Sequence, residues 1–341
     1  MNNELRVGVI GAGLIGLRRI KEIVLHPDTK CVIVADTDED AAIKAATMYD
    51  VDEITTNWQI ALSQKLDIVV VSTPNGYLSE IACAALEKGC HVLVEKPMGR
   101  NVKEARQMQT SSLDTTRRLK VGFNHRYHPA IAKAHTLVSN GEIGDIINIR
   151  CRYGHGGRPG YESEWRGNRE LSGGGELTDQ GVHVVDLIHW FAGVPQRAMG
   201  AIQTAVWPLG DLEDNGFGMF FFESGAVAQF HTSWTQWKNL FSFEVFGTKG
   251  SVIVEGLGKS YGVETLTIHK RKLSGGVPDT EVFQYNGEDT SWKFEWEDFI
   301  RAIRYGSPML GTDADGVIAM RMIDSIYRSA QLGGEVTVSY D

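Results

Sequence analysis

Short apolar segments alternate with amphipathic segments through the first third of the chain. Each apolar segment stops at a glycine, a proline or a polar residue, and most are followed by apolar positions at helical spacing. Strands that alternate with helices in this way are typical of a parallel sheet covered by helices. The predicted strands are 5–10, 31–35, 53–56, 66–72, 90–95 and 119–123, and the predicted helices include one that ends near 25 and others at 58–64, 77–88 and 101–113.

From residue 145 onward the apolar positions recur every second residue. Glycine, proline and aspartate turns separate these segments, which indicates a mainly antiparallel sheet. Its predicted strands are 145–153, 198–207, 215–223, 226–235, 241–247, 251–255 and 335–340, with helices at 176–191, 291–305 and 313–332. The change of period predicts an α/β domain at 1–123 and an α+β domain at 124–341, whose C-terminal helices pack back.

A glycine turn follows the first predicted strand, with the sequence Gly11-Ala12-Gly13-Leu14-Ile15-Gly16. In a strand–turn–helix unit the first glycine makes the tight turn, the second lets the backbone approach a pyrophosphate, and the third lets helix and strand pack closely. Free amide groups and the positive end of the helix dipole then bind the phosphates. The turn therefore predicts the dinucleotide site of a Rossmann domain, with Leu14 and Ile15 among its residues.

A carboxylate ends the second predicted strand. Asp36 lies about 20 residues beyond Gly16, where a carboxylate can accept hydrogen bonds from both ribose hydroxyls. It would repel the extra phosphate of NADP, by roughly 4 kcal/mol for like unit charges at about 4 Å and an effective dielectric near 20. The next residues, Thr37 to Asp40, supply no arginine, so the sequence favours NAD over NADP. A helix cap is the alternative role for Asp36.

Polar residues also end later strands of the same sheet. Because ligands bind outside the carboxyl ends of parallel strands, we expect these residues at the mouth of the cofactor crevice. Glu95 and Lys96 end one strand just before Pro97, and a charged side chain there is a candidate for chemistry. The further candidates for cofactor contacts are Thr37, Ser72, Thr73, Pro74, Asn75 and Asn124, together with Glu95 and Lys96.

A second group of polar residues lies on the helix predicted at 176–191. Asp179, His183 and Asp186 fall at i, i+4 and i+7, on one stripe of that helix. The rest of the helix is strongly apolar, so we expect the stripe to face a site or a hydrogen-bonded network. A metal site that combines His183 with His189 is disfavoured, because their spacing places them on different faces and no cysteine is near. No metal is expected.

The composition is that of a soluble globular protein, with 42% hydrophobic and 23% charged residues. A formal net charge of -9 gives no basic field for a nucleic acid backbone, so nucleic acid is not an expected partner. We find no apolar run of membrane-spanning length and no signal-peptide pattern, and we expect a cytoplasmic protein with no membrane partner. The four cysteines lack metal-type spacing and are expected to be reduced thiols.

Together these motifs resemble the Gfo/Idh/MocA family of NAD(P)-dependent oxidoreductases. The resemblance covers essentially the whole chain and rests on Gly11-x-Gly13-x-x-Gly16 with Asp36, Ser72-Thr73-Pro74-Asn75, Glu95-Lys96-Pro97, Gly122-Phe123-Asn124, Gly173-Gly174-Gly175 and Asp179-x-Gly181-x-His183. The family implies a Rossmann domain and an open-faced antiparallel sheet that often serves as an oligomer interface. It therefore implies a homo-oligomer, a dimer or tetramer, formed through this sheet.

The resemblance also implies roles for individual residues. Lys96, Asp179 and His183 become the catalytic group, and the peptide bond after Lys96 is often cis in the family. Many members have a histidine where Leu78 stands, so one contact is missing or replaced here. The segment from Arg158 to Arg166 looks like members that act on sugars or sugar nucleotides. The candidate substrate contacts are Lys96, Asn124, Arg126, Tyr153, Tyr161, Trp165, Arg166, Asp179 and His183.

The implied reaction oxidises a secondary alcohol, so that a hydroxyl proton is removed while hydride leaves the same carbon for the nicotinamide. Lys96 suits proton transfer because a cationic nicotinamide and partial burial favour the neutral amine. His183 can take or relay the proton, with Asp179 fixing its tautomer or stabilising the imidazolium. The residues do not decide whether Lys96 or His183 makes the primary transfer.

We expect an NAD-dependent dehydrogenase of a sugar, a polyol such as an inositol, or a nucleotide sugar. Two alternatives stay open. One is a glycoside hydrolase of the same family that oxidises its sugar transiently with tightly held NAD, and the other is a non-catalytic sensor that binds NAD and a sugar. Net NADH formation separates the dehydrogenase from the hydrolase. An intact Lys96, Asp179 and His183 counts against the sensor.

Overall fold

The computed structural model describes residues 4–340, and the chain forms two compact units. The first is Met1–Phe123 together with Trp292–Val317, and the second is Asn124–Ser291 together with Ile318–Asp341. The segment 292–317, which the sequence assigned to the second domain, therefore belongs to the first unit.

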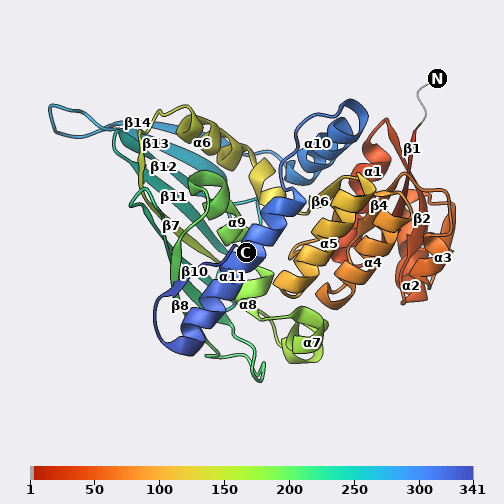
Figure 1. Cartoon of the computed structure of the whole chain (residues 1–341). Helices are drawn as coiled ribbons and strands as arrows, with labels where there is room; N and C mark the ends of the chain where they lie inside the picture. The colour runs from red at the N-terminus through yellow and green to blue at the C-terminus, as the bar shows by residue number, and fades with distance from the viewer. Residues whose placement is uncertain (1–3, 341) are drawn as a thin grey trace. The chain divides into compact units, whose positions relative to one another are not determined.

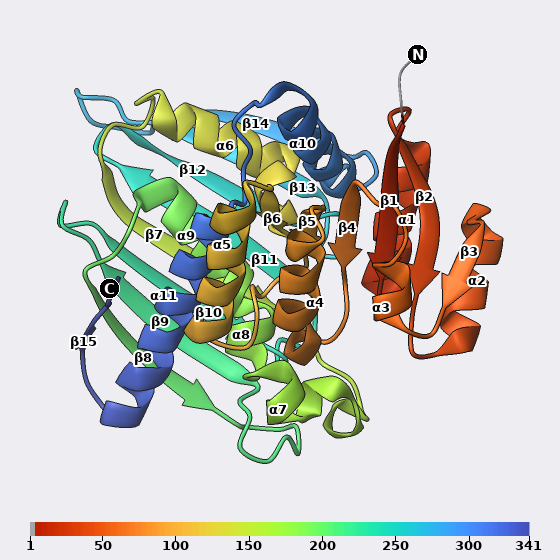
Figure 2. The same cartoon turned by 45° about the vertical axis from the view of Figure 1, so that its right-hand side comes forward.

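Six parallel strands form the sheet of the first unit, in the order β3-β2-β1-β4-β5-β6, which can be followed by its labels in Figure 2, while Figure 1 shows the whole chain. This order confirms the predicted Rossmann domain, and its direction reverses between β1 and β4, where such sheets bind ligands. The strands are β1 (Leu5–Ile10), β2 (Thr29–Ala35), β3 (Glu53–Thr55), β4 (Ile68–Val71), β5 (His91–Val94) and β6 (Leu119–Val121). The helices between them are α1 (Leu14–Leu25), α2 (Glu39–Tyr49), α3 (Trp58–Ala61), α4 (Asn75–Glu87) and α5 (Val102–Thr115).

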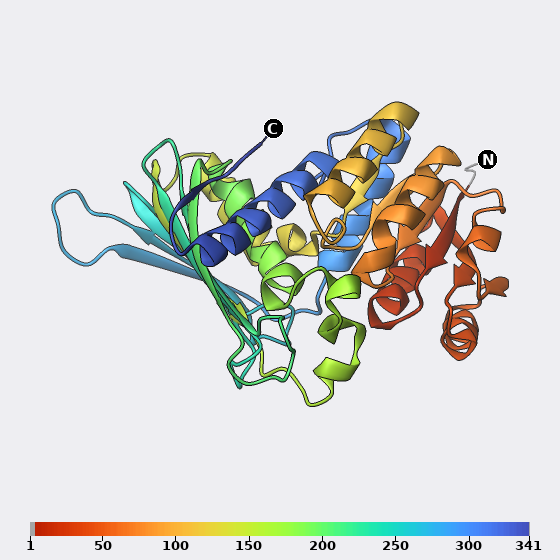
Figure 3. The same ribbon diagram turned by 60° about the horizontal axis from the view of Figure 1, so that its bottom comes forward.

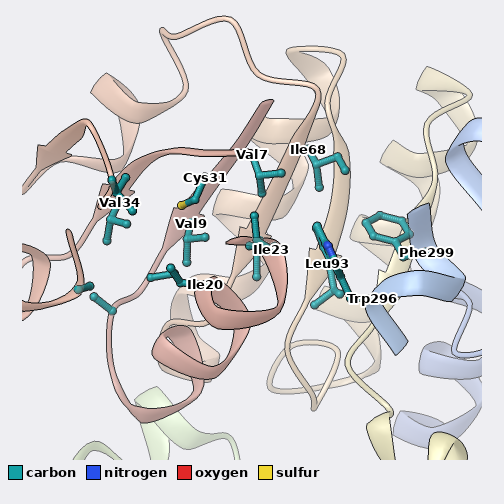
Figure 4. Packing of buried hydrophobic residues seen from close by; sticks show 14 of the residues in the cluster. Val7, Val9, Ile20, Ile23, Cys31, Val34, Ile68, Leu93, Trp296 and Phe299 are labelled. Carbon is teal, nitrogen blue, oxygen red and sulfur yellow. The ribbon is translucent and has the colours of Figure 1, made fainter. Parts of the chain in front are cut away.

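A helix from the C-terminal part of the chain completes the core of the first unit. Trp296 and Phe299 of α10 (Ser291–Tyr305) pack in one cluster with Val7 of β1, Ile23 of α1 and Leu93 of β5 (Figure 4). Trp296 is only 2% exposed. Burial of these two aromatic side chains removes a large apolar area from water, which holds α10 in this unit.

Nine strands form the sheet of the second unit, in the order β14-β13-β12-β11-β7-β10-β9-β8-β15. Only β7 and β10 pair in parallel, so the predicted mainly antiparallel sheet is confirmed. The strands are β7 (Ile146–Gly154), β8 (Arg197–Gln203), β9 (Asn215–Phe221), β10 (Val227–Ser233), β11 (Leu240–Gly247), β12 (Gly250–Glu255), β13 (Glu264–Lys270), β14 (Asp279–Tyr285) and β15 (Val336–Thr337). Strands β13 and β14 were not predicted from the sequence. Most residues of β14 are exposed, so it lacks the apolar alternation that marks a strand.

Helices cover one face of this second sheet (Figures 2 and 3). They include α6 (Pro129–Ser139), α8 (Glu176–Asp179) and α9 (Gly181–Ala192), together with residues 318–332 of α11 (Asp313–Leu332). A short 3-10 helix, η1 (Asn124–Tyr127), precedes α6, and the four-residue α7 (Arg169–Ser172) precedes α8. The four cysteines are free thiols, as expected. Every helix within residues 4–340 is too short or too polar to cross a membrane.

Candidate functional site

The glycine turn joins β1 to α1 at the carboxyl edge of the parallel sheet. Gly11 has a φ of +100°, and a Cβ there would lie 2.6 Å from the backbone of Ser72. A Cβ at Gly16 would lie 1.9 Å from the carbonyl oxygen of Gly11. At Gly13, in contrast, an added Cβ would meet nothing within 4 Å. The turn is therefore tight at both ends and open in the middle, just before α1, which fits a pyrophosphate approaching the backbone amides.

The carboxylate of Asp36 lies on this glycine turn. Its Oδ2 accepts a hydrogen bond from the amide of Ala12 at 2.6 Å, and its Oδ1 accepts one from the amide of Asp38 at 3.0 Å. Asp38, not Asp36, is the N-cap of α2. Asp36 is half-buried and Thr37 is exposed. The alternative role of Asp36 as a helix cap is thus wrong, and its carboxylate stands beside the turn, as ribose recognition requires.

The residues after β4 and β5 lie at the same edge of the sheet. Ser72 donates a hydrogen bond to the carbonyl oxygen of Gly11 at 2.8 Å, and so supports the glycine turn. Thr73 and Pro74 follow it half-buried, and the buried Asn75 begins α4.

Lys96 is half-buried, and its bond to Pro97 is cis, as the family resemblance implied. Because β1, β2 and β5 are parallel, Lys96 shares one sheet edge with the glycine turn and Asp36. Leu78 is fully buried in α4.

Glu95 was expected at the mouth of the crevice, and this expectation is wrong for its side chain. Its Oε1 accepts a hydrogen bond from Arg19 Nε at 2.7 Å, and the residue is only 6% exposed. Arg19 also pairs with Glu295 of α10, and burial raises the pKa of Glu295.

The helix predicted at 176–191 is broken at Gln180 in the second unit. Asp179 ends α8, and His183 and Asp186 lie on α9. At the break, an added Cβ on Gly181 would approach the side chain of Leu177 to 3.0 Å. The three polar residues that were expected on one stripe therefore have different partners.

Asp179 is held by an arginine. Its Oδ2 accepts a hydrogen bond from Arg166 Nε at 2.9 Å, and the Asp179 carboxylate raises the pKa of Arg166. The guanidinium of Arg166 also lies over the ring of Trp165, 4.4 Å from its centroid. Arg166 and Trp165 were expected at the substrate, and the structure places them together beside a catalytic candidate.

His183 lies against a histidine that the sequence analysis did not select. The rings of His125, in η1, and His183 are stacked with their centroids 3.8 Å apart and an angle of 18° between planes. Both residues are 5% exposed. The only sequence signal for His125 was its position next to Asn124, at the end of the last strand of the parallel sheet.

Asp186 and Arg126 form a buried ion pair. Arg126 Nε donates to Asp186 Oδ2 at 2.9 Å, and Arg126 Nη2 donates to Oδ1 at 2.6 Å. Both side chains are almost completely buried. The expected contact between Arg126 and substrate is therefore wrong, because this bidentate pair commits the guanidinium to Asp186.

The remaining substrate candidates are buried among protein groups. Asn124 Nδ2 donates to Ser291 Oγ at 3.0 Å, and Asn124 Oδ1 is 3.2 Å from His125 Nδ1. Tyr153 is hydrogen-bonded to Tyr261, and burial raises the pKa of Tyr153 well above its ordinary value. Tyr161 packs with Leu209, Leu212 and Trp234. These contacts give Asn124, Tyr153 and Tyr161 structural roles in the second unit.

The arrangement supplies the groups of a dehydrogenase in two sets. The first unit carries the glycine turn, Asp36 and Lys96 on one sheet edge. The second carries an imidazole, His183, and a carboxylate, Asp179, each positioned by a neighbouring side chain. Within residues 4–340, no three His, Cys, Asp or Glu side chains are grouped to hold a metal ion.

Comparison with known proteins gives the chain its family. Residues 5–123 match the profile of the oxidoreductase family with an NAD-binding Rossmann fold, and residues 131–253 match that of the GFO/IDH/MocA C-terminal domain. Levoglucosan dehydrogenase of Pseudarthrobacter phenanthrenivorans is 28% identical over 285 residues, 73% of each chain. D-glucoside 3-dehydrogenase of Escherichia coli is 27% identical over 98% of each chain.

A solved structure has the same fold. Levoglucosan dehydrogenase in complex with NADH and levoglucosan superposes with a TM-score of 0.91, over 99% of this chain and 100% of that one, at 24% identity. The chain belongs to the Gfo/Idh/MocA family of oxidoreductases, with an NAD-binding Rossmann domain followed by the C-terminal domain of that family.

Proposed function

We propose that this protein is an NAD-dependent dehydrogenase that acts on CH–OH groups, transferring hydride between nicotinamide and a secondary alcohol of a sugar or polyol. The observation that carries the proposal is the placement of Lys96. It is half-buried at the same sheet edge as a glycine turn shaped for pyrophosphate and a carboxylate placed for ribose. A lysine there is suited to bind the reacting oxygen of a substrate beside the cofactor.

NAD is the proposed cofactor, in preference to NADP. Asp36 supports this preference, because its negative charge beside the glycine turn would repel a 2′-phosphate. When bound, the nicotinamide supplies the hydride acceptor. Leu14 and Ile15, at the start of α1, together with Ser72, Thr73 and Asn75, are the further residues proposed to line the cofactor site.

Side chains of the protein are proposed to transfer the proton of the substrate hydroxyl. Lys96 is proposed to bind and orient the substrate hydroxyl, and His183 to take or relay its proton as the alcohol is oxidised or the carbonyl reduced, with the primary transfer assigned to neither of the two alone. Asp179 is the carboxylate proposed for this catalytic group, and Arg166 holds it through a hydrogen bond of 2.9 Å.

Sugar rings are the proposed substrates. The two named relatives act on levoglucosan and D-glucosides, and a more distant relative, of Bacillus subtilis, is a scyllo-inositol 2-dehydrogenase. All of these molecules present secondary hydroxyls on a six-membered ring. We therefore infer a pyranose, an anhydro sugar, a glycoside or an inositol as substrate.

Net formation of NADH tests this function. The protein would be incubated with NAD and, separately, with free sugars, levoglucosan, aryl glucosides, inositols and nucleotide sugars. We expect NADH to accumulate in proportion to the oxidised sugar. Release of aglycone from an aryl glucoside without net NADH would instead establish the hydrolase, and turnover of none of the panel would reject the proposal.

Self-association through the open face of the second sheet is also proposed. Arg150, Phe217, His231 and Glu244 line a hollow of about 550 Å³ on that face. Arg150 and Glu244 pair across neighbouring strands, and the ring of Phe217 stacks on His231. We expect sedimentation velocity to show a dimer or tetramer, and Phe217→Asp to dissociate it. A monomeric wild type would reject this interface.

A further inference from the structure

The stacked ring of His125 fixes one side of the catalytic candidate His183. The ring centroids are 3.8 Å apart, and the planes differ by 18°. His125 comes from η1 and His183 from α9, so the contact joins two separate elements. Stacking of two flat rings restricts the rotation of His183 about its side-chain bonds.

A chain of hydrogen bonds determines which nitrogen of His125 carries the proton. Ser291 Oγ lies 2.6 Å from Asp289 Oδ1, and a carboxylate only accepts, so the serine hydroxyl donates to Asp289. Ser291 Oγ must then accept from the amide nitrogen of Asn124, at 3.0 Å. The carbonyl oxygen of Asn124 consequently faces His125 Nδ1, at 3.2 Å, and accepts its proton. Neutral His125 is therefore the Nδ1–H tautomer, with its lone pair on Nε2.

Other rings enclose His125 and prevent it from turning. Tyr153 and Phe241 meet it edge-on, with centroids 5.4 Å and 6.2 Å away. His128 lies 5.6 Å away, and its own Nδ1 is bound to Glu264 at 3.0 Å. His125 is thus held on its edges as well as through Nδ1.

The support of His125 begins where the chain passes between the two units. Asn124 follows the first crossing, after Phe123, and Ser291 precedes the second, before Trp292. The hydrogen bond between Asn124 and Ser291 ties these two points of the backbone together. His125 is therefore anchored by Asn124 and Ser291, which lie where the chain enters and leaves the second unit.

We propose that His125 is the positioning residue of His183: its Nδ1–H tautomer, fixed by Asn124, Ser291 and Asp289, holds the imidazole of His183 in the orientation that accepts the substrate proton. This inference rests on the proposed function and deepens it. His125 itself does not transfer the proton.

Steady-state kinetics of His125→Phe test the proposal, with the substrate identified in the NADH assay. Phenylalanine keeps a flat ring but removes the Nδ1 anchor. We expect kcat to fall by about 10- to 100-fold, as displacement of a reacting group does, with KM for the sugar and Kd for NAD within about twofold of wild type. His135→Phe is the matched control, because His135 stacks on Trp190 of the same helix α9 at 3.7 Å. An equal kcat in the two variants would overturn the proposal.

A second pair of variants tests the anchor without touching either histidine. Ser291→Ala should lower kcat by about threefold to tenfold, the equivalent of one hydrogen bond, and Ser291→Thr, which keeps the hydroxyl, should restore it. Equal losses in both variants would overturn the proposal. If His125→Phe fails to fold, the two Ser291 variants still test the positioning role of His125.

Nitrogen NMR of labelled imidazoles reads the tautomer directly and needs no turnover. We expect the His125 signal, assigned by its loss in His125→Phe, to show a proton on Nδ1. A proton on Nε2 would overturn the inference. If the wild-type protein shows no turnover, the proposed function is rejected but the inference about His125 is not. If the wild type is active and His125→Phe has an unchanged kcat, only the inference about His125 is rejected.

Discussion

Arg166 donates a hydrogen bond to Asp179 at 2.9 Å, and so ties the segment before α7 to the last residue of α8. Arg158, earlier in the same segment, pairs with Glu164, whose Oε2 also lies 3.8 Å from Arg166 Nη1. The side chain of Arg158 is 60% exposed and that of Arg166 is 27% exposed. Two arginines close in sequence thus differ in function: one holds a catalytic candidate, and the other pairs at the surface.

Replacement of Arg166 is predicted to impair catalysis. Arg166→Ala removes a charge-assisted hydrogen bond from Asp179, worth roughly 1.5–3 kcal/mol, so we expect kcat to fall by about 10- to 150-fold. Arg158→Ala is the control and should change kcat by less than about threefold, because exposed ion pairs contribute little. Steady-state kinetics with NAD and the identified sugar measure both. Equal effects of the two variants would refute the role given to Arg166.

Neutralisation of Asp36 is predicted to relax the discrimination against NADP. Asp36→Asn keeps an oxygen that can accept from Ala12 while it removes the charge that repels the 2′-phosphate. The ratio of NADP to NAD affinity should rise by about tenfold or more, measured by fluorescence titration of both cofactors. Asp38→Asn alters only the cap of α2 and serves as the control. An unchanged ratio in Asp36→Asn would remove Asp36 from the ribose site.

The ion pairs of Arg19 are predicted to stabilise the first unit. Arg19→Met would leave Glu95 and Glu295 buried without their cation, which should lower the free energy of unfolding by roughly 3–5 kcal/mol. Urea denaturation measures the loss. Lys30→Met breaks the exposed pair of Lys30 with Asp52 and should have no measurable effect. Equal stability of Arg19→Met and Lys30→Met would show that the buried ion pairs contribute no more to the free energy of unfolding than the exposed pair does.

Glu213 is predicted to make stability depend on pH. It is buried, it accepts hydrogen bonds from Tyr327 at 2.7 Å and from the amide of Leu177 at 3.0 Å, and burial raises its pKa. The folded state therefore keeps a proton that the unfolded state has already lost. Its contribution to stability is full below the unfolded pKa and is lost as the pH rises through the folded pKa.

Glu213→Gln should abolish this part of the pH dependence. The amide oxygen still accepts both hydrogen bonds but no longer titrates. We expect the thermal midpoint of the variant to fall less than that of the wild type as the pH rises from about 4 to about 7. Glu223→Gln, at an exposed position, should follow the wild type. Parallel curves for wild type and Glu213→Gln would contradict the prediction.

The sequence predicted the features that depend on local pattern. Strand–helix alternation and the glycine turn predicted a Rossmann domain, which the observed strand order confirms, and a carboxylate after β2 can be placed from chain direction alone. The cis bond before Pro97 came from the family resemblance, not from spacing. These features need no knowledge of which distant residues meet.

The features that were missed depend on long-range pairing. Arg126 was expected to bind substrate, but in the fold it pairs with Asp186. Glu95 was expected at the mouth of the cofactor crevice, but it pairs with Arg19. The importance of His125 arises only from the ring of His183 stacked on it. The C-terminal helices were predicted to pack back, but Trp296 was not identified as part of the first core. In each case a partner far along the chain decides the role, and hydrophobic period alone cannot identify it.

Lys96→Ala is the most direct test of the account. The variant and the wild type would be compared for NAD binding by titration and for NADH formation with the identified sugar. The account predicts that NAD binds to Lys96→Ala with nearly wild-type affinity, while turnover falls by about 1,000-fold or more, as expected for loss of a group that acts on the reacting oxygen. Undiminished turnover, or loss of NAD binding together with turnover, would contradict it.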